Sequence, residues 1–338
     1  MNKINYKKER ININILSLFD GISCGRQALK KLGVPVTNYF ASEIEEAAIH
    51  IALKNHPDIN PLGDINNITE EKLKSFPKID LILAGSPCQG FSRNGKGLNF
   101  DDPRSKLFFK FIEILNWIKE NNNPNVKFLL ENVQMKKEWE KVIDEYTGQK
   151  AMEINSSLVS AQKRPRLYWT NIEGVTQPED KGIYLTDILE SQVSDDYIVD
   201  ESILRSEPVE MYDNDGNLLW RIERFIDIHN DNKAVVRNAT RQGYLIAEHG
   251  DSINLALPNS KTRRGRVGKG KSNTLDTQCN QAVLINGKVR KFTVTELERL
   301  QTLPDGYTEG IKDSARKKAI GNGWTVDVIS HILNFNVK

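Results

Sequence analysis

The stretch AGSPCQGFS, residues 84–92, places a thiol where a strand is expected to end. The apolar run IDLILAG comes just before it, and Ser86-Pro87 is typical of a turn. A cysteine alone is more often a small buried side chain, but at a strand end its thiolate can act as a covalent nucleophile. The pattern favours nucleophilic chemistry at Cys88, with the amide of Gln89 beside it.

Other fragments carry groups that could assist a thiolate. Glu131 ends the apolar run VKFLLEN, and Arg164 and Arg166 stand two residues apart in QKRPR. Groups at the carboxyl ends of neighbouring strands in an open α/β sheet converge on one crevice. We therefore expect these side chains to meet Cys88 despite their separation in sequence.

Strand-like and helix-like segments alternate through the first half of the chain. Continuous apolar strands that alternate with helices predict a parallel sheet covered on both faces. Gly33 and Pro57 are expected to end the first two helices. The expected strands are 13–20, 38–43, 79–85, 126–132 and 166–172, and the expected helices are 25–32, 45–56 and 105–120.

Helical periodicity fades in the middle of the chain and returns near residue 293. Short segments punctuated by Gly, Asn, Ser and Thr predict a separate, irregular module over 175–285. Thr293 and Glu296 then fit a capping box that opens a helix. We predict a large α/β domain, formed by 1–174 and 286–338, with the smaller domain 175–285 inserted.

The segment FDGISCG, residues 19–25, could form a cofactor-binding turn between the first strand and the first helix. Glycines there let the backbone approach a ligand, and a helix amino terminus favours anionic groups. Glu43 follows Gly21 by 22 residues, where an acid binds ribose in nucleotide-binding α/β folds. Asp64 could accept a hydrogen bond from an adenine amine. The spacing is not GxGxxG, so a nicotinamide-dependent oxidoreductase stays open at this point.

Composition limits the class of protein. The chain has 338 residues and a formal charge of +2, which says little about partners. Three dispersed cysteines argue against a disulfide framework and for a reducing compartment. The polar start and the lack of an apolar run of about 20 residues predict a soluble cytoplasmic protein without a membrane segment. Five histidines without metal-ligand spacing predict no metal site.

Taken together, the ordered motifs resemble the DNA (cytosine-5)-methyltransferase family, over about residues 13–172 and 286–335. They are FDGISCG, SPCQGFS, ENV, QKRPR, RKFTVTELERLQTLPDGY and IGNGWTVDV. FDGIS and GNGW are similar to the phage-type enzymes rather than to the commoner FAGxGG and GNS forms. The resemblance implies a Rossmann-like methyltransferase fold, a target-recognition domain in the middle, and a bacterial or phage origin.

The resemblance also implies a mechanism. Cys88 would add to C6 of a cytosine that has been flipped out of duplex DNA. Glu131 would contact N3 and the exocyclic amine. Arg164 and Arg166 would hold the ring carbonyl and a neighbouring phosphate, with Arg166 favoured for the base. Gly90, Gly95 and Gly97 predict that loop 90–103 is a mobile lid over that base.

The cofactor implied is S-adenosyl-L-methionine, with S-adenosyl-L-homocysteine as product. Phe19 would stack on adenine, Glu43 would bind the ribose, and Asp64 would accept from the adenine amine. The full set expected around the cofactor is Phe19, Asp20, Gly21, Ile22, Glu43, Ile44, Asp64, Ile65, Pro87, Leu107, Asn322 and Trp324.

The expected partner is double-stranded DNA. The run KTRRGRVGKGK, residues 261–271, holds six basic residues and no acidic one, which suits phosphate contacts and guanine recognition, although such runs are usually solvated loops. Thr274 matches the family's Thr-Leu pair. We expect a monomer without an obligate protein partner. The expected DNA contacts are Gln89, Ser92, Arg104, Arg263, Arg264, Arg266, Lys269 and Thr274.

Three other functions agree less well with the motifs. An RNA cytosine methyltransferase would use the same fold, but the compact basic module and the lack of an appended RNA-binding segment favour DNA. A non-enzymatic DNA-binding protein has no use for the complete chemical set. A nicotinamide-dependent oxidoreductase gives the PCQ and ENV motifs no role. The sequence leaves open the DNA sequence that is methylated, and whether the enzyme serves a restriction-modification system or protects a phage genome.

Overall fold

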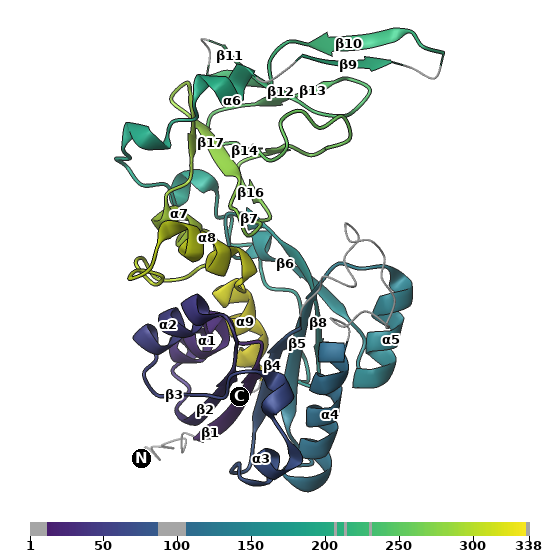
Figure 1. The fold of residues 1–338 in the computed structure, drawn as a ribbon, viewed down its shortest axis with the longest axis vertical. Coiled ribbons are helices and arrows are strands. Elements are labelled where there is room, and N and C mark those ends of the chain that lie inside the picture. Colours follow the sequence, from purple (N-terminus) through teal and green to yellow (C-terminus); the bar gives the residue numbers. More distant parts are fainter. Residues whose placement is uncertain (1–11, 87–105, 206–207, 213–214, 230–231, 336–338) are drawn as a thin grey trace, which may run out of the picture. The chain divides into compact units, whose positions relative to one another are not determined.

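The computed structural model describes residues 12–86, 106–205, 208–212, 215–229 and 232–335 (Figure 1). The chain divides into two compact units. The first comprises Met1–Ile154, Arg166–Gln177 and Val328–Lys338, and the second comprises Asn155–Pro165 and Pro178–Asp327. This division follows compactness, so residues 286–327 fall in the second unit. The functional division predicted from the sequence stays a prediction.

One mostly parallel sheet forms the centre of the first unit, with the strand order β3-β2-β1-β4-β5-β8-β6. The pairs β1–β2, β2–β3, β1–β4 and β4–β5 are parallel. The mixed α/β class predicted from the sequence is thereby confirmed. The strands are β1 Ile13–Leu18, β2 Val36–Ser42, β3 Ile59–Pro61, β4 Leu81–Gly85, β5 Lys127–Val133, β6 Met152–Asn155 and β8 Pro165–Thr170.

Apolar residues on both faces of the central strands explain why helices cover the sheet on both sides. On one face Leu16, Ile82 and Phe128 belong to a core that also includes Phe111 and Leu115 of α4. The alternate residues of the same strands, such as Leu83 and Leu129, are fully buried as well. Figure 1 shows α1 and α2 on one side of these strands and α4 and α5 on the other. The helices are α1 Cys24–Leu32, α2 Glu46–Asn55, α3 Glu70–Lys74, α4 Lys106–Asn121 and α5 Lys137–Thr147, with the 3-10 turn η1 Ile65–Asn67.

β8 is an antiparallel strand of the mostly parallel sheet. β8 runs antiparallel to β5, with Val133 opposite Arg166 and Glu131 opposite Tyr168. The chain reaches β8 from β6 through a connection too short for a parallel crossover. The start of β8 therefore lies at the same sheet edge as the carboxyl end of β5, and this places Arg166 there.

The second unit contains several small sheets, in which most of the short strands are antiparallel. Its sheets are β10-β9, β11-β12-β13 and β15-β14-β17-β18, together with the parallel pair β16-β7. A core that includes Phe225, Val236 and Leu284 lies among them. The strands are β7 Gln162–Lys163, β9 Val209–Tyr212, β10 Leu218–Ile222, β11 Ile226–His229, β12 Lys233–Arg237, β13 Tyr244–Ala247, β14 Ser252–Asn254, β15 Val267–Gly268, β16 Ser272–Asn273, β17 Gln281–Ile285 and β18 Lys288–Lys291.

Local capping sets the helix ends that were predicted. Gly33 caps α1 in the left-handed conformation at φ 68°. The Thr293 hydroxyl accepts from the Glu296 amide, and the Glu296 carboxylate accepts from the Thr293 amide, which confirms the capping box of α7. Within the described ranges, none of the helices is both long and apolar enough to cross a membrane. The remaining helical elements are α6 Glu201–Arg205, α7 Val294–Leu300, α8 Asp313–Asn322 and α9 Val326–Asn334, with η2 Ser156–Leu158, η3 Leu185–Asp187 and η4 Asp195–Tyr197.

Candidate active site

The turn from β1 to α1 is held from inside by Asp20. Phe19 and Ser23 both have positive φ, 58° and 57°, which non-glycine residues rarely adopt. The Asp20 carboxylate accepts hydrogen bonds from the Ser17 hydroxyl at 2.5 Å, the Tyr39 hydroxyl at 2.7 Å and the Ser23 hydroxyl. Burial raises the pKa of Asp20, although these three hydroxyl donors oppose the rise. The Asp20 side chain thus shapes the turn, and only its backbone is left for the predicted cofactor contact.

Glu43 is oriented by three backbone amides at the carboxyl end of β2. Its Oε2 accepts from the Gly21 amide at 2.8 Å, and its Oε1 accepts from the amides of Ile44 and Glu45 at 2.8 and 2.9 Å. A carboxylate can accept about four hydrogen bonds, so capacity remains for a ligand. The side chain of Ile44, which was also predicted at the cofactor, is 68% exposed.

Asp64 stands on the neighbouring loop, close in the fold to the end of β2. The Ser42 hydroxyl donates to the Gly63 carbonyl at 2.7 Å, which ties this loop to β2. Asp64 Oδ1 accepts from the backbone and side-chain nitrogens of Asn66, both at 2.9 Å. Within the part of the chain that the structure describes, Oδ2 has no hydrogen-bond partner. Ile65 is 3% exposed and packs in the core, against which Phe19 and Leu107 also pack.

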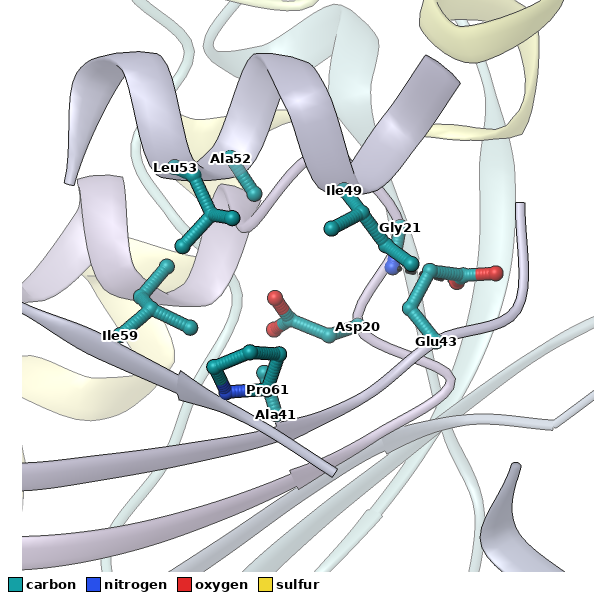
Figure 2. A pocket seen from close by; sticks show the side chains of 9 residues that line it. All are labelled: Asp20, Gly21, Ala41, Glu43, Ile49, Ala52, Leu53, Ile59 and Pro61. Atoms are coloured by element: carbon teal, nitrogen blue, oxygen red, sulfur yellow. Dashed lines mark hydrogen bonds between the residues drawn. The ribbon is translucent and has the colours of Figure 1, made fainter. Parts of the chain in front are cut away.

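A small cavity lies behind Glu43 and is shown in Figure 2. Its volume is about 10 Å³, so it is too small for a nucleoside. Figure 2 shows the carboxylate of Glu43 directed away from the apolar side chains of the cavity. The predicted cofactor contact of Glu43 would therefore be on the side of the carboxylate that faces away from this cavity. The lining residues are Asp20, Gly21, Ala41, Glu43, Ile49, Ala52, Leu53, Ile59 and Pro61.

Glu131 and Arg166 form an ion pair at the sheet edge. Arg166 Nε lies 3.0 Å from Glu131 Oε1, and the two side chains are 12% and 11% exposed. Gly85, near the end of β4, lies opposite Glu131 in the parallel pairing of β4 with β5. The segment that continues from β4 leads to Cys88, three residues after Gly85. The structure therefore places Glu131 and Arg166, two of the predicted catalytic side chains, beside the strand end that leads to Cys88.

Asn132 fixes the start of the segment that leads to Cys88. Its side-chain amide donates to the Ser86 hydroxyl at 3.0 Å and to the Ser86 carbonyl at 3.4 Å, and Asn132 is 1% exposed. Its own Oδ1 accepts from the Val133 amide at 2.8 Å. Asn132 belongs to the ENV motif, but no role was predicted for it from the sequence. An amide side chain directly after the predicted catalytic acid was the available signal.

Several predicted residues lie outside the described ranges. They belong to segment 87–105, which includes the expected lid at 90–103, and their roles stay predictions. They are Pro87, Cys88, Gln89, Ser92 and Arg104.

Arg164 is buried and bonded to backbone carbonyls. It is 4% exposed, and its guanidinium donates to the carbonyl of Leu275 at 3.2 Å and to the carbonyls of Gly321 and Gly323, both at 3.0 Å. These carbonyls fix the guanidinium in the protein interior, and the predicted catalytic role of Arg164 stays a prediction. Arg164 therefore has a structural position in the second unit, where it ties Leu275 to the GNG segment.

A buried polar network continues from this arginine and was not predicted. Gln162 donates to the Leu300 carbonyl at 3.1 Å and accepts from the Leu275 amide at 3.0 Å. Gln301 donates to the Gly323 carbonyl at 3.0 Å and accepts from the Thr325 hydroxyl at 2.9 Å. Such satisfied networks specify one arrangement of the backbone. The GNG segment is thus held in place by side chains from distant parts of the sequence.

Gly321 is required by close backbone packing. A Cβ atom at this position would lie 2.2 Å from the carbonyl oxygen of Asp276. This oxygen belongs to the main chain, so it cannot move away by a side-chain rotation. Asn322, in contrast, is exposed at the end of α8, and Trp324 is half-buried. These two residues therefore keep accessible surface for the predicted cofactor contact.

Comparison with known proteins agrees with this geometry. The model of the C-5 cytosine-specific DNA methylase family matches residues 13–336. The chain belongs to this family. Among its relatives, the type II methyltransferase M.HpaII of Haemophilus parainfluenzae is 30% identical over 95% of this chain and 88% of that protein. M1.ScrFI of Lactococcus lactis subsp. cremoris is 30% identical over 94% of this chain and 76% of that protein.

Other similarities are shorter or concern only the fold. The type II methyltransferase M.NlaIV of Neisseria lactamica is 40% identical over 126 residues, which span 36% of this chain and only 28% of that relative. A putative prophage-encoded DNA modification methyltransferase of E. coli superposes with a TM-score of 0.63 at 18% identity, over 96% of this chain and 98% of that one. Spodoptera frugiperda DNMT2 gives 0.61 at 22% identity, over 97% and 100%. The fold of this methylase is thus shared across distant relatives.

The basic segment of the methylase contains side chains in unlike environments. Arg266 is 1% exposed and its guanidinium donates to backbone carbonyls, and its predicted contact with DNA stays a prediction. Lys269 is exposed but forms ion pairs with Glu248 at 3.0 Å and Asp251 at 2.7 Å, which offset its charge. The other predicted DNA contacts in the second unit are Arg263, Arg264 and Thr274. The Thr274 hydroxyl donates to the Lys163 carbonyl at 2.7 Å.

Proposed function

We propose that this protein transfers a methyl group from S-adenosyl-L-methionine to C5 of cytosine in duplex DNA. The observation that carries the proposal is the ion pair of Glu131 and Arg166 beside the strand end that leads to Cys88. A carboxylate and a guanidinium together match the nitrogen edge and the carbonyl of a pyrimidine ring. Membership of the cytosine-specific methylase family supports the same chemistry.

Cys88 is the proposed nucleophile. Its thiolate would bond to C6 of cytosine, and the electron pair of the C5–C6 double bond would then make C5 nucleophilic. S-adenosyl-L-methionine supplies the electrophilic methyl group when it is bound. After C5 has gained the methyl group and lost its proton to water, the double bond re-forms and the bond between sulfur and C6 breaks, which restores the thiolate.

Glu131 and Arg166 would control the charge that arrives in the ring. Glu131 would accept a hydrogen bond from the exocyclic amine and, in its protonated form, donate one to N3, and the latter strengthens as electron density moves into the ring. Arg166, held beside it at 3.0 Å, would bind the ring carbonyl. Asn132 would act through position, because it fixes Ser86 at the start of the segment that carries Cys88.

The turn after β1 fits an adenosine cofactor. Glu43 is fixed by three backbone amides and keeps acceptor capacity for a ribose diol. Asp64 Oδ2, which has no partner among the described residues, would accept from the adenine amine. Phe19, strained at φ 58°, would stack on the adenine ring. The predicted contacts of Ile22, Asn322 and Trp324 complete this proposal.

The proposed substrate is a cytosine flipped out of the helix, because C5 and C6 are otherwise enclosed in the base stack. We propose that one protomer acts on one strand, in the cytoplasm of a bacterial cell, as the bacterial relatives suggest. The second unit, with Arg263 and Arg264, would contact the duplex.

Transfer of tritiated methyl groups from S-adenosyl-L-methionine tests this function. Duplex DNA should become labelled, RNA should not, and Cys88→Ser should abolish the label. DNA that contains 5-fluorocytosine should trap the wild type in an adduct that survives a denaturing gel, because fluorine cannot leave as a proton does. Label in RNA alone would contradict the proposal, and bisulfite sequencing of labelled DNA would give the target sequence.

A further inference from the structure

The connection between β14 and β15, residues 255–266, is held from beneath by the side chain of Arg266. Asn254 and Arg266 extend the hairpin, since the Asn254 amide donates to the Arg266 carbonyl at 2.8 Å. The Arg266 guanidinium then donates to the carbonyls of Asn254 at 3.2 Å, Ala256 at 2.9 Å and Leu257 at 2.6 Å. It also lies over the ring of Phe225 at 4.7 Å. One buried side chain thus fixes the backbone on the first side of the loop.

The other side of the loop is attached to the turn that follows β12. The Ala239 amide donates to the Arg263 carbonyl at 2.9 Å, and Arg264 Nε donates to the Ala239 carbonyl at 2.9 Å. Within the loop the Ser260 amide donates to the Leu257 carbonyl at 3.0 Å. Backbone groups are therefore paired along the loop, and its conformation is set before any ligand arrives.

This fixed loop presents Leu257 in an unusual state. Leu257 has a φ of 52°, a left-handed conformation that favours glycine, and its side chain is 67% exposed. An exposed leucine buries little apolar surface, so its side chain does not explain the strain. A strained, solvent-facing apolar residue that surrounding hydrogen bonds hold in place is a candidate functional residue.

The charges around Leu257 identify the kind of partner. Between Asp251 and Asp276 the chain contains no acidic residue. Lys261 and Arg263 have side chains without a hydrogen-bond partner in the described part of the chain, and Lys261 is exposed. A cationic loop with free donors fits a polyanion, and an exposed apolar side chain on the same loop fits a surface that is not wholly polar. The major groove of DNA has both features, because the thymine methyl group lies among polar base edges.

We propose that Leu257 is a specificity-determining residue that contacts a thymine methyl group in the recognised DNA sequence, while Lys261, Arg263 and Arg264 contact the phosphates. This inference rests on the proposed function and adds to it a base and the residue that reads it. Arg266 is the positioning residue, because it holds the carbonyl of Leu257. The recognised sequence must then include a thymine besides the target cytosine.

The test compares Leu257→Ala, Leu257→Met and Leu257→Gly with the wild type on a random pool of DNA sequences, read by bisulfite sequencing. Leu257→Ala should relax one thymine position and lower kcat/KM on the preferred site about fivefold, whereas Leu257→Met should keep the preference. Replacement of that thymine by deoxyuridine should cost the wild type about fourfold, as loss of one buried methyl group does. It should cost Leu257→Ala nothing further.

Stability separates this role from a structural one. Leu257→Gly should raise Tm by about 1–2 °C because it relieves the left-handed strain, and it should still lose the thymine preference. A matched control is Leu218→Ala on β10, where another leucine is 53% exposed; its site preference should equal that of the wild type. A lower Tm for Leu257→Gly would indicate a structural leucine.

The remaining outcomes are distinct. A wild type that methylates a defined site without a thymine, or an unchanged preference in Leu257→Ala, would overturn the inference and leave the proposed function intact. A wild type that labels no DNA at all would overturn the proposed function itself.

Discussion

Two arginine environments in this methylase show how the partner of a cation determines what the cation can do. Arg166 pairs with a carboxylate at a sheet edge, where both side chains keep some exposure. Arg164, two residues earlier, is buried and donates to three backbone carbonyls. A carboxylate can exchange its guanidinium for a substrate group, whereas interior carbonyls that lose their donor have no replacement. The first arrangement is suited to chemistry and the second to architecture.

The largest effect should come from the carboxylate of the first pair. Glu131→Gln keeps the size of the side chain but removes its negative charge, so it weakens control of charge in the pyrimidine ring. We expect kcat to fall by about 10²–10⁴-fold, with a Tm close to that of the wild type. Single-turnover methyl transfer and thermal unfolding measure the two quantities.

Arg166→Met provides the matched substitution in the same pair and should show the same division between activity and stability. Equal losses of activity and of folded protein would show that this ion pair stabilises the fold, as Arg164 does. Arg166 and Arg164 would then not differ in the way proposed.

The buried arginine should show the reverse division. Arg164→Met leaves the carbonyls of Leu275, Gly321 and Gly323 without their donor in the interior. The free energy of unfolding should fall by about 3–4 kcal/mol, while the folded fraction should keep most of its kcat at low temperature. Urea unfolding followed by fluorescence, with activity measured on the same samples, checks this expectation. An unchanged midpoint would show that water replaces the guanidinium.

The GNG segment offers a test of the same architecture without any charge. Gly321→Ala introduces a Cβ atom 2.2 Å from the Asp276 carbonyl oxygen, so α8 must shift. The free energy of unfolding should fall by about 2–3 kcal/mol. Ser314→Ala, an exposed position of the same helix, is the control and should be close to neutral. A stable Gly321→Ala variant with poor cofactor binding would instead assign the glycine to the ligand.

The same comparison explains what the sequence could and could not predict. Gly33, Thr293 and Glu296 act within a few residues of themselves, so their capping roles were predictable. The approach of Glu131 to the strand before Cys88 followed from the rule that carboxyl ends of parallel strands share one edge. The environment of an arginine is not local, because it depends on which carbonyls or carboxylates the fold brings near it.

The direction of a strand and the burial of an individual side chain were not predictable from the sequence. The reversal of β8 depends on the length of its connection, and it places Arg166 rather than Arg164 beside Glu131. Arg266 stands in a basic run, and nothing in its neighbours distinguishes it from Arg264. Only the folded loop shows that Arg266 turns inward to three carbonyls while Arg264 stays exposed. The link from Asn132 to Ser86 was hidden for the same reason.

A buried basic side chain can also lose its charge, and His56 extends the comparison to that case. Burial lowers the pKa of Arg266 to about 10, so it remains protonated at neutral pH. His56 is 2% exposed; burial, with the charges of Arg26 and Lys30, lowers its pKa from 6.5 to about 4. The folded state therefore prefers neutral imidazole. This contribution to stability is complete above pH 6.5 and is lost as the pH falls toward 4.

We accordingly expect the free energy of unfolding to decrease by about 1–2 kcal/mol between pH 7 and pH 5 on account of His56. Urea titrations at both pH values, in the wild type and in His56→Gln, isolate this share because the carboxylates are common to the two proteins. The decrease should be smaller in His56→Gln by that amount. An equal decrease of the free energy of unfolding in both proteins would mean that His56 is protonated in the folded protein. The preference of the interior for a neutral imidazole would then not hold at this position.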